Sequence, residues 1–142
     1  FQPGWQDSDR EWMLGEMKDF LTKHEAWVID GNYSWCYYKE RMQEADQIIF
    51  LNFSPWTCLF RAFKRYLTYR GKVRENMAAG CPERFDWNFI RWILWDGRSK
   101  SAKERYQQIQ ETYPEKVIVL RSQKEMDQFL EKLTHNKKNQ RV

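Results

Sequence analysis

The sequence predicts a single α/β domain in which a parallel β-sheet is flanked by helices in three layers. Three short apolar runs, at residues 27–30, 48–53 and 117–120, are bounded by turn signals, as is typical of buried parallel strands. Segments with apolar residues at helical spacing lie before, between and after these runs. Strands that alternate with helices form βαβ units, which make neighbouring strands parallel. The length of 142 residues fits one domain, residues 1–142, with a sizeable core.

Two helices are expected around the first apolar run. Ser8 and Glu11 have the spacing of a capping box, and apolar residues then recur at helical spacing to about residue 23. After the run, Ser34 is a candidate N-cap for a second helix that ends at Asp46.

The helix after the second apolar run has clear signals at both ends. Ser54-Pro55 combines an N-cap residue with a proline in the first turn, and Gly71 suits the C-terminal cap. The apolar positions between them predict a buried stripe, made of Trp56, Leu59, Phe60, Phe63 and Leu67. Residues 71–85 then carry glycines and a proline without periodicity, so we expect a lid-like excursion there.

The rest of the chain predicts three more helices. Two lie between residues 86 and 113, and the first of them is crowded with Trp87, Trp92 and Trp95, which suit either an acceptor pocket or a dimer contact. The last helix follows the third apolar run, and residues 135–142 are a polar, basic tail that we expect to be frayed.

Composition and cysteine spacing limit the ligands, the metal sites and the membrane contacts that we expect. The net charge of +4 is compatible with phosphate-bearing ligands but is too small to require nucleic acid. Cys36, Cys58 and Cys81 are widely spaced without a Cys-x-x-Cys pair, which favours reduced thiols in a cytoplasmic protein over disulfides or a zinc site. No apolar run approaches membrane-spanning length, so we expect no membrane partner.

Asp30 is the first candidate site residue. It follows Trp27, Val28 and Ile29 directly and precedes Gly31, so it is the last residue of the expected strand. Ligands of open α/β sheets bind at that edge, and a carboxylate there is a candidate for holding a cation or a phosphate-bound metal. The alternative from these residues alone is an Asp-Gly turn that leaves a core strand.

Basic residues form the second candidate site. They lie opposite the apolar stripe of the helix over residues 55–70 and continue into the excursion: Arg61, Lys64, Arg65, Arg70, Lys72 and Arg74. Guanidinium groups bind phosphate oxygens in pairs and neutralise the charge of a phosphoryl group in transfer. The alternative is a solvated helix face. Neither a Walker A motif nor a Gly-x-Gly-x-x-Gly motif occurs in the chain.

Five stretches together resemble the DNA topology modulation protein (FlaR-related) family, adenylate-kinase-like members of the P-loop nucleoside triphosphatase superfamily. They are residues 1–5 (FQPGW), 27–34 (WVIDGNYS), 44–46 with 48–53 (EAD, IIFLNF), 69–74 (YRGKVR) and 80–83 (GCPE). The likeness covers nearly the whole chain, and the last two stretches are the most specific. It implies an adenylate-kinase-like P-loop fold that is N-terminally incomplete here, because the first strand, the Walker A loop, its helix and the second strand would precede residue 1.

The resemblance implies an ATP-dependent phosphotransferase with a nucleotide or small-molecule acceptor and a magnesium ion. Asp30 would lie near the magnesium and the phosphates, holding the ion through water, while Asn32 and Tyr33 would face the acceptor. The arginines of the lid and the phosphates would be Arg65, Arg70 and Arg74. The catalytic residues would be Asp30, Arg65 and Arg70, with Arg61 and Arg74 binding phosphate.

Two alternatives to an active kinase stay open. One is a nucleic-acid-binding DNA topology modulator whose basic helix contacts the DNA backbone, which predicts a steep loss of affinity with salt. The other is a degenerate scaffold without activity. We expect the chain to be inactive without the missing P-loop, and the sequence leaves the acceptor and the oligomeric state open.

Overall fold

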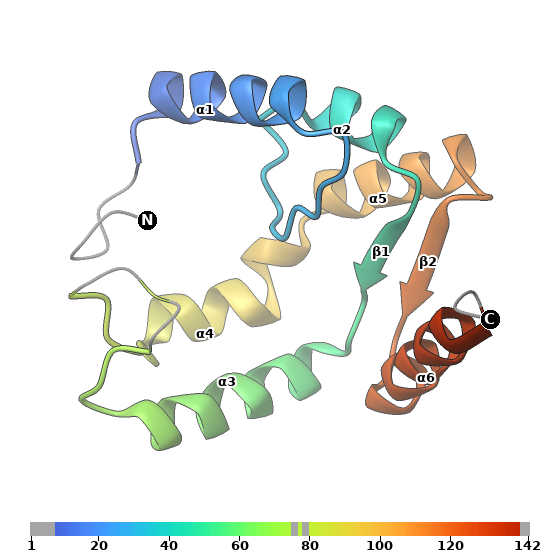
Figure 1. Ribbon diagram of the computed structural model, residues 1–142. Helices are drawn as coiled ribbons and strands as arrows, with labels where there is room; N and C mark the ends of the chain where they lie inside the picture. Colours follow the sequence, from blue (N-terminus) through green and yellow to red (C-terminus); the bar gives the residue numbers. More distant parts are fainter. Residues whose placement is uncertain (1–7, 75–76, 78–79, 140–142) are drawn as a thin grey trace. The chain divides into compact units, whose positions relative to one another are not determined.

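The computed structural model describes residues 8–74, 77 and 80–139, with side chains as far as residue 135 (Figure 1). Its elements in chain order are α1 (Arg10–Lys23), α2 (Tyr38–Glu44), β1 (Ile48–Leu51), α3 (Pro55–Tyr69), α4 (Trp87–Leu94), the 3-10 helix η2 (Asp96–Arg98), α5 (Lys100–Thr112), β2 (Val117–Leu120) and α6 (Gln123–Asn139). The described chain forms two compact units. Of the described residues, unit 1 comprises 8–45, 66–74, 77 and 80–84, and unit 2 comprises 46–65 and 85–139.

The β-sheet of unit 2 is parallel and, within the described residues, has two strands. Ile48 lies opposite Val117 and Leu51 opposite Leu120. Beyond the strand ends, the Asn52 amide donates to the Leu120 carbonyl at 2.8 Å. The α/β class and the parallel order are therefore confirmed, whereas this part of the chain does not contain a full three-layer sheet.

The strand expected at residues 27–30 does not form. These residues have no regular secondary structure, and Val28 is 94% exposed. A strand is stable only when its backbone groups pair with a neighbouring strand, and no described segment pairs with this one. The prediction of a strand here is wrong because the apolar run has no partner to satisfy it.

The core of unit 2 lies where β1 and β2 meet the helices that follow and connect them. Its buried apolar residues are Ile48, Phe53, Ala62, Ile93, Ala102, Ile109 and Leu120. The Phe50 ring packs against Tyr106 of α5, with centroids 5.2 Å apart. The apolar runs at residues 48–53 and 117–120 thus supply strands and core residues, as expected, although each strand has only four residues.

Helix α3 begins where its sequence predicts, but its apolar stripe is largely exposed. The Ser54 hydroxyl oxygen accepts from the Thr57 amide at 3.1 Å, which caps the first turn. Trp56 and Phe60 are nevertheless 71% and 67% exposed, and Ala62 is the buried residue of the helix. The prediction of a buried stripe is wrong for these side chains, because no described element covers them. The three tryptophans of the next segment, Trp87, Trp92 and Trp95, are exposed as well.

The two N-terminal helices begin later than expected. The N-cap of α1 is Asp9 instead of Ser8, because the Asp9 carboxylate accepts from the Trp12 amide at 2.8 Å. Helix α2 begins at Tyr38, several residues after the expected cap Ser34, since Tyr37 adopts a left-handed conformation with a φ of 44°. A left-handed residue interrupts the helical path, so Ser34 belongs to a turn.

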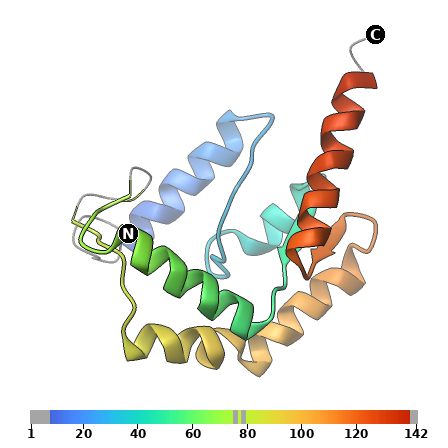
Figure 2. The same ribbon diagram turned by 90° about the horizontal axis from the view of Figure 1, so that it is seen from below.

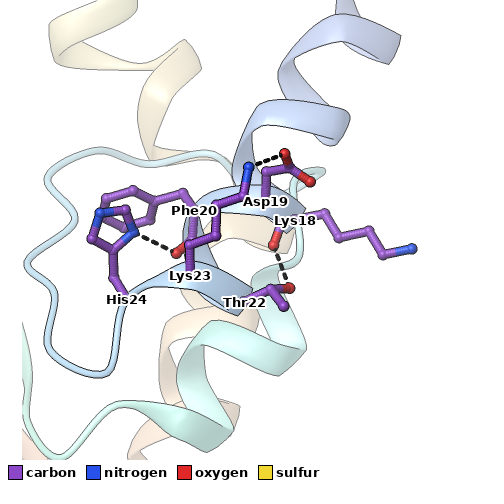
Figure 3. A network of polar contacts seen from close by, with 6 residues as sticks. All are labelled: Lys18, Asp19, Phe20, Thr22, Lys23 and His24. Atoms are coloured by element: carbon purple, nitrogen blue, oxygen red, sulfur yellow. Dashed lines mark hydrogen bonds and ion pairs between the residues drawn. The ribbon is translucent and has the colours of Figure 1, made fainter.

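Short-range contacts close the C-terminal end of α1 (Figure 3). The Lys23 ammonium lies 2.6 Å from the Asp19 carboxylate, and the hydrogen bond between them lowers the pKa of Asp19 and raises that of Lys23. The His24 ring stacks on Phe20, with centroids 4.6 Å apart, and its Nδ1 lies 2.9 Å from the Phe20 carbonyl oxygen. These residues close a helix end in solvent, which is a structural role.

The excursion and the tail are described in part. Gly71 and Gly80 have φ values of 74° and 70°, which favour glycine, and the described residues between 71 and 85 form no helix or strand. Residues 75–76 and 78–79 lie outside the described residues, and so do residues 1–5. Helix α6 continues to Asn139 (Figure 2), so residues 135–139 of the expected tail are helical, while residues 140–142 lie outside the described part.

Candidate functional site

The carboxyl edge of the β1–β2 pair gathers two arginines around Phe53. Phe53 follows β1 and is buried. The Arg61 guanidinium lies 4.1 Å from the centroid of the Phe53 ring, and Nη2 of Arg98 donates to the Phe53 carbonyl oxygen at 3.0 Å. This is the edge at which open parallel sheets bind ligands, so cationic groups there are suited to an anionic ligand.

Arg61 connects the ends of both strands. Its Nη2 donates to the Gln123 side-chain oxygen at 2.5 Å, and Gln123 is the first residue of α6, directly beyond β2. Arg61 is exposed, and a guanidinium carries five N–H donors. Arg65 lies one turn further along α3, half-buried, on the same side of the helix. The structure therefore places two of the predicted arginines along one helix that starts at the ligand edge.

Arg98 is a functional candidate that the sequence did not indicate. Besides the Phe53 bond, its Nε donates to the Ile93 carbonyl at 3.1 Å, and its Nη2 lies 3.5 Å from the Cys58 sulfur. These contacts join the end of α4 to the first turns of α3, so Arg98 positions the helix that carries Arg61. The sequence feature that could have indicated Arg98 is its position beside Gly97, between two predicted helices. Helix ends there leave carbonyl groups without partners in the helix, and an arginine can donate to them.

The remaining predicted site residues belong to unit 1. Asp30 and Asn32 are exposed, and Asp30 forms no hydrogen bond or ion pair within the described chain. Gly31 has a φ of 137°, and a Cβ there would collide with the Tyr33 ring. The segment is thus a tight turn that displays the Asp30 carboxylate to solvent.

Arg41 is a second residue that the sequence reasoning missed. It is 3% exposed and is the buried charged residue of the described chain. Its Nη2 donates to the Tyr33 carbonyl at 2.6 Å, and its Nε to the Tyr37 carbonyl at 3.4 Å. A buried charge needs such partners, so Arg41 holds the turn between Tyr33 and Tyr37 in place. The available signal was its position three residues after Tyr38, on the inner side of the helix.

The two arginines predicted for the lid are already engaged within unit 1. The Arg70 guanidinium lies 6.0 Å from the centroid of the Tyr66 ring. Nε of Arg74 lies 2.5 Å from the Glu83 carboxylate, and the two side chains are 25% and 6% exposed. The Arg74–Glu83 ion pair joins the two ends of the excursion, so Arg74 must leave Glu83 before it can contact a phosphate.

The described residues contain no preformed group of side chains that would hold a metal ion. Within the described residues no three His, Cys, Asp or Glu side chains lie close enough together to hold a metal. A single exposed carboxylate such as Asp30 is compatible with magnesium, which proteins often bind through one or two carboxylates while phosphates and water fill the other positions.

Comparison of the chain with protein-family models, with curated proteins and with solved structures found no match. The family resemblance therefore stays a prediction from the sequence. The class that the structure itself defines is a mixed helix and sheet protein with a parallel strand pair and an arginine-bearing carboxyl edge. No helix in the described chain has the length and apolar character that crossing a membrane requires.

Proposed function

We propose that this protein is an ATP-dependent phosphotransferase of adenylate-kinase type that acts on a nucleotide or small-molecule acceptor. The observation that supports this most is the position of Arg61 at the carboxyl edge of the parallel strands, with Arg65 one turn behind it on α3. Phosphoryl transfer depends mainly on positioning and on neutralising charge, and guanidinium groups at a ligand edge supply both.

In this proposal each predicted residue has one task. Arg61 and Arg65 of unit 2 hold phosphate oxygens, and Arg70 and Arg74 of unit 1 keep the phosphate-binding role that the resemblance implies. Asn32 and Tyr33 hold the acceptor. Asp30 orients a magnesium ion through water, and for a hydroxyl acceptor it also takes the proton. The magnesium ion, when bound, neutralises phosphate charge.

The proposal requires a phosphate cradle, and the 142 residues contain no Walker A motif. Within the described residues only β2 pairs with β1, and Ile49 and Leu51 of β1 are 42% and 60% exposed. The resemblance implies a further strand that carries the cradle and pairs with β1, and an element packed on the sheet would cover the face of Ile49 and Leu51. We therefore expect these 142 residues to bind phosphate, and we expect turnover only together with such a cradle.

Phosphate binding at the edge is tested by titrating the chain with Mg-ATP in a calorimeter. Arg61→Met is expected to weaken binding about tenfold, since a charge-assisted hydrogen bond contributes about 1.5–3 kcal/mol. Arg91→Met is the matched control, because Arg91 is an exposed arginine of unit 2 that pairs with Asp96. Equal affinities of the two variants would remove Arg61 from the site.

The catalytic role of Asp30 is tested in the longest natural form of the protein. Asp30→Asn is expected to abolish phosphoryl transfer from ATP to the acceptor and to leave DNA affinity unchanged or slightly raised. The DNA-binding alternative predicts instead a duplex affinity that falls steeply with salt concentration and is insensitive to Mg-ATP. Normal turnover in the Asp30→Asn protein would exclude the proposed mechanism.

A further inference from the structure

We infer that unit 2 pairs with a second copy of this chain through an exposed row of aromatic side chains on α3. The row consists of Trp56, Phe60 and Phe63, and we call it the aromatic face. Residues spaced by three and four positions project from the same side of a helix, so these three side chains are neighbours on the surface of α3. The inference goes beyond the proposed function and does not depend on it.

The aromatic face is open to water in the described chain. Trp56, Phe60 and Phe63 are 71%, 67% and 42% exposed, whereas Ala62 on another side of α3 is 5% exposed. Single exposed apolar side chains are normal, but a row of neighbouring aromatic side chains is typical of a surface that another molecule covers. Residues 55–65 of α3 contain no Asp or Glu and a single Lys, as is common in interface cores.

The exposed area matches what a stable dimer needs. A large aromatic side chain presents about 150–250 Å², so the three exposed fractions leave about 400 Å² of the aromatic face in water. A standard interface buries about 800 Å² per partner, of which about 56–58% is non-polar. The aromatic face alone therefore supplies most of the non-polar area that one copy must contribute, and polar groups around it supply the rest.

The order of the residues makes the aromatic face complementary to itself. Trp56 lies four residues before Phe60 and Phe63 three residues after it, which places them about 6 Å and about 4.5 Å from Phe60 in opposite directions along the helix axis. When two copies of α3 pack antiparallel about a two-fold axis at Phe60, Trp56 of each copy lies opposite Phe63 of the other. Such aromatic pairs stabilise an interface beyond the area that they bury.

The basic residues of α3 allow this pairing. Arg61 and Arg65 lie on other sides of the helix, and Arg61 contacts Phe53 and Gln123. Lys64 borders the aromatic face, but in the antiparallel arrangement the two Lys64 positions are about 12 Å apart along the axis. That distance exceeds the Debye length of about 8 Å at physiological salt, so their repulsion is weak. Arg61, the proposed phosphate ligand, stays outside the interface.

Sedimentation velocity of the 142-residue chain tests the pairing over protein concentrations from about 0.1 to about 100 μM, because interfaces of standard size have Kd values of about 1 μM or lower. A reversible monomer–dimer equilibrium is expected. Phe60→Ser should raise the dimer Kd at least about tenfold, since it removes a ring of both copies at the centre of the interface. Leu130→Ser is the matched control, because Leu130 is a 53% exposed apolar residue of α6. This control variant should dimerise like the unchanged protein.

Trp56→Ser covers the case in which Phe60→Ser fails to fold, as judged by circular dichroism. Trp56 is exposed, and its loss should weaken the dimer as well. A chain that stays monomeric at every concentration would overturn the inference and leave the aromatic face to a different partner. Dimerisation that neither variant weakens would overturn it too. Growth into larger oligomers would do the same, because a two-fold interface closes at two copies.

Discussion

Replacing Arg98 with alanine should destabilise unit 2 far more than replacing a neighbouring surface arginine. Arg98 is half-buried and donates to two backbone carbonyl groups, those of Ile93 and Phe53, at 3.1 and 3.0 Å. The alanine variant leaves both carbonyl oxygens without this donor. Phe53 itself is 5% exposed, so water does not easily replace the guanidinium at this point.

The expected loss of stability in Arg98→Ala follows from the two hydrogen bonds that Arg98 donates to backbone carbonyl groups. A hydrogen bond from a charged group contributes about 1.5–3 kcal/mol, and the lower value suits a half-buried donor. Two such bonds amount to about 3 kcal/mol, while the contact with the Cys58 sulfur adds little because thiols are weak acceptors. Relative to a total stability of about 5–15 kcal/mol, this is a large loss.

Arg91→Ala is the control for Arg98→Ala. Arg91 pairs with Asp96 at 2.8 Å, but the two side chains are 57% and 49% exposed. An exposed pair of this kind contributes about 0–1 kcal/mol. Urea denaturation followed by circular dichroism measures both variants, and equal m-values would show that the comparison is valid. A loss in Arg98→Ala no greater than that in Arg91→Ala would refute the positioning role of Arg98.

Two further predictions concern unit 1 and the thiols. Asp9→Ala should lower the free energy of unfolding by about 1 kcal/mol in urea denaturation, because it removes the cap of α1. Ser8→Ala should change the free energy of unfolding by less than about 0.5 kcal/mol. A larger loss in Ser8→Ala than in Asp9→Ala would show that Ser8 is the cap. A thiol reagent at pH 8 should label Cys58 first, since Cys36 and Cys81 are 0% and 1% exposed, and faster labelling of either buried thiol would contradict the structure. Burial raises the pKa of Cys36 above its ordinary value of 9.0, so the folded state keeps the proton where the unfolded chain loses it. The stability that this proton confers is present below about pH 9 and lost as the pH rises further, and Cys36→Ala should reduce that alkaline decline in Tm.

The sequence predicted correctly those elements that depend on neighbouring residues in the chain. The cap of α3 needs only Ser54 and the proline beside it, and the hydroxyl of Ser54 bonds the Thr57 amide as that pattern indicates. The parallel pair of β1 and β2 was likewise predictable, because two continuous apolar runs separated by helices have few other arrangements. The cap is determined by residues within the helix start, and each strand is apolar enough to be recognised separately from its distant partner.

Features that depend on distant partners were not predictable. Residues 27–30 have the composition of a buried strand, yet burial requires a neighbour, and Val28 is 94% exposed without one. The roles of Arg41 and Arg98 depend on which carbonyl groups the fold brings to them, and the Phe53 carbonyl is 45 residues away from Arg98 in the chain. The basic face of α3 indicated Arg61, but its contact with Gln123 spans 62 residues, and helical spacing carries no information about it.

The exposure pattern of β1 bears on the proposed function. Ile48 is 5% exposed, whereas Ile49 and Leu51, on the other face of the strand, are 42% and 60% exposed. A strand adapted to water on one face alternates apolar with polar residues, but Ile48-Ile49-Phe50-Leu51 is apolar throughout, as in sheets that are covered on both faces. Such a sequence fits a working state in which another element covers Ile49 and Leu51. A further parallel strand that paired with β1 would end at the same carboxyl edge at which Arg61 lies, and this is where a phosphate cradle has to be for the proposed phosphoryl transfer.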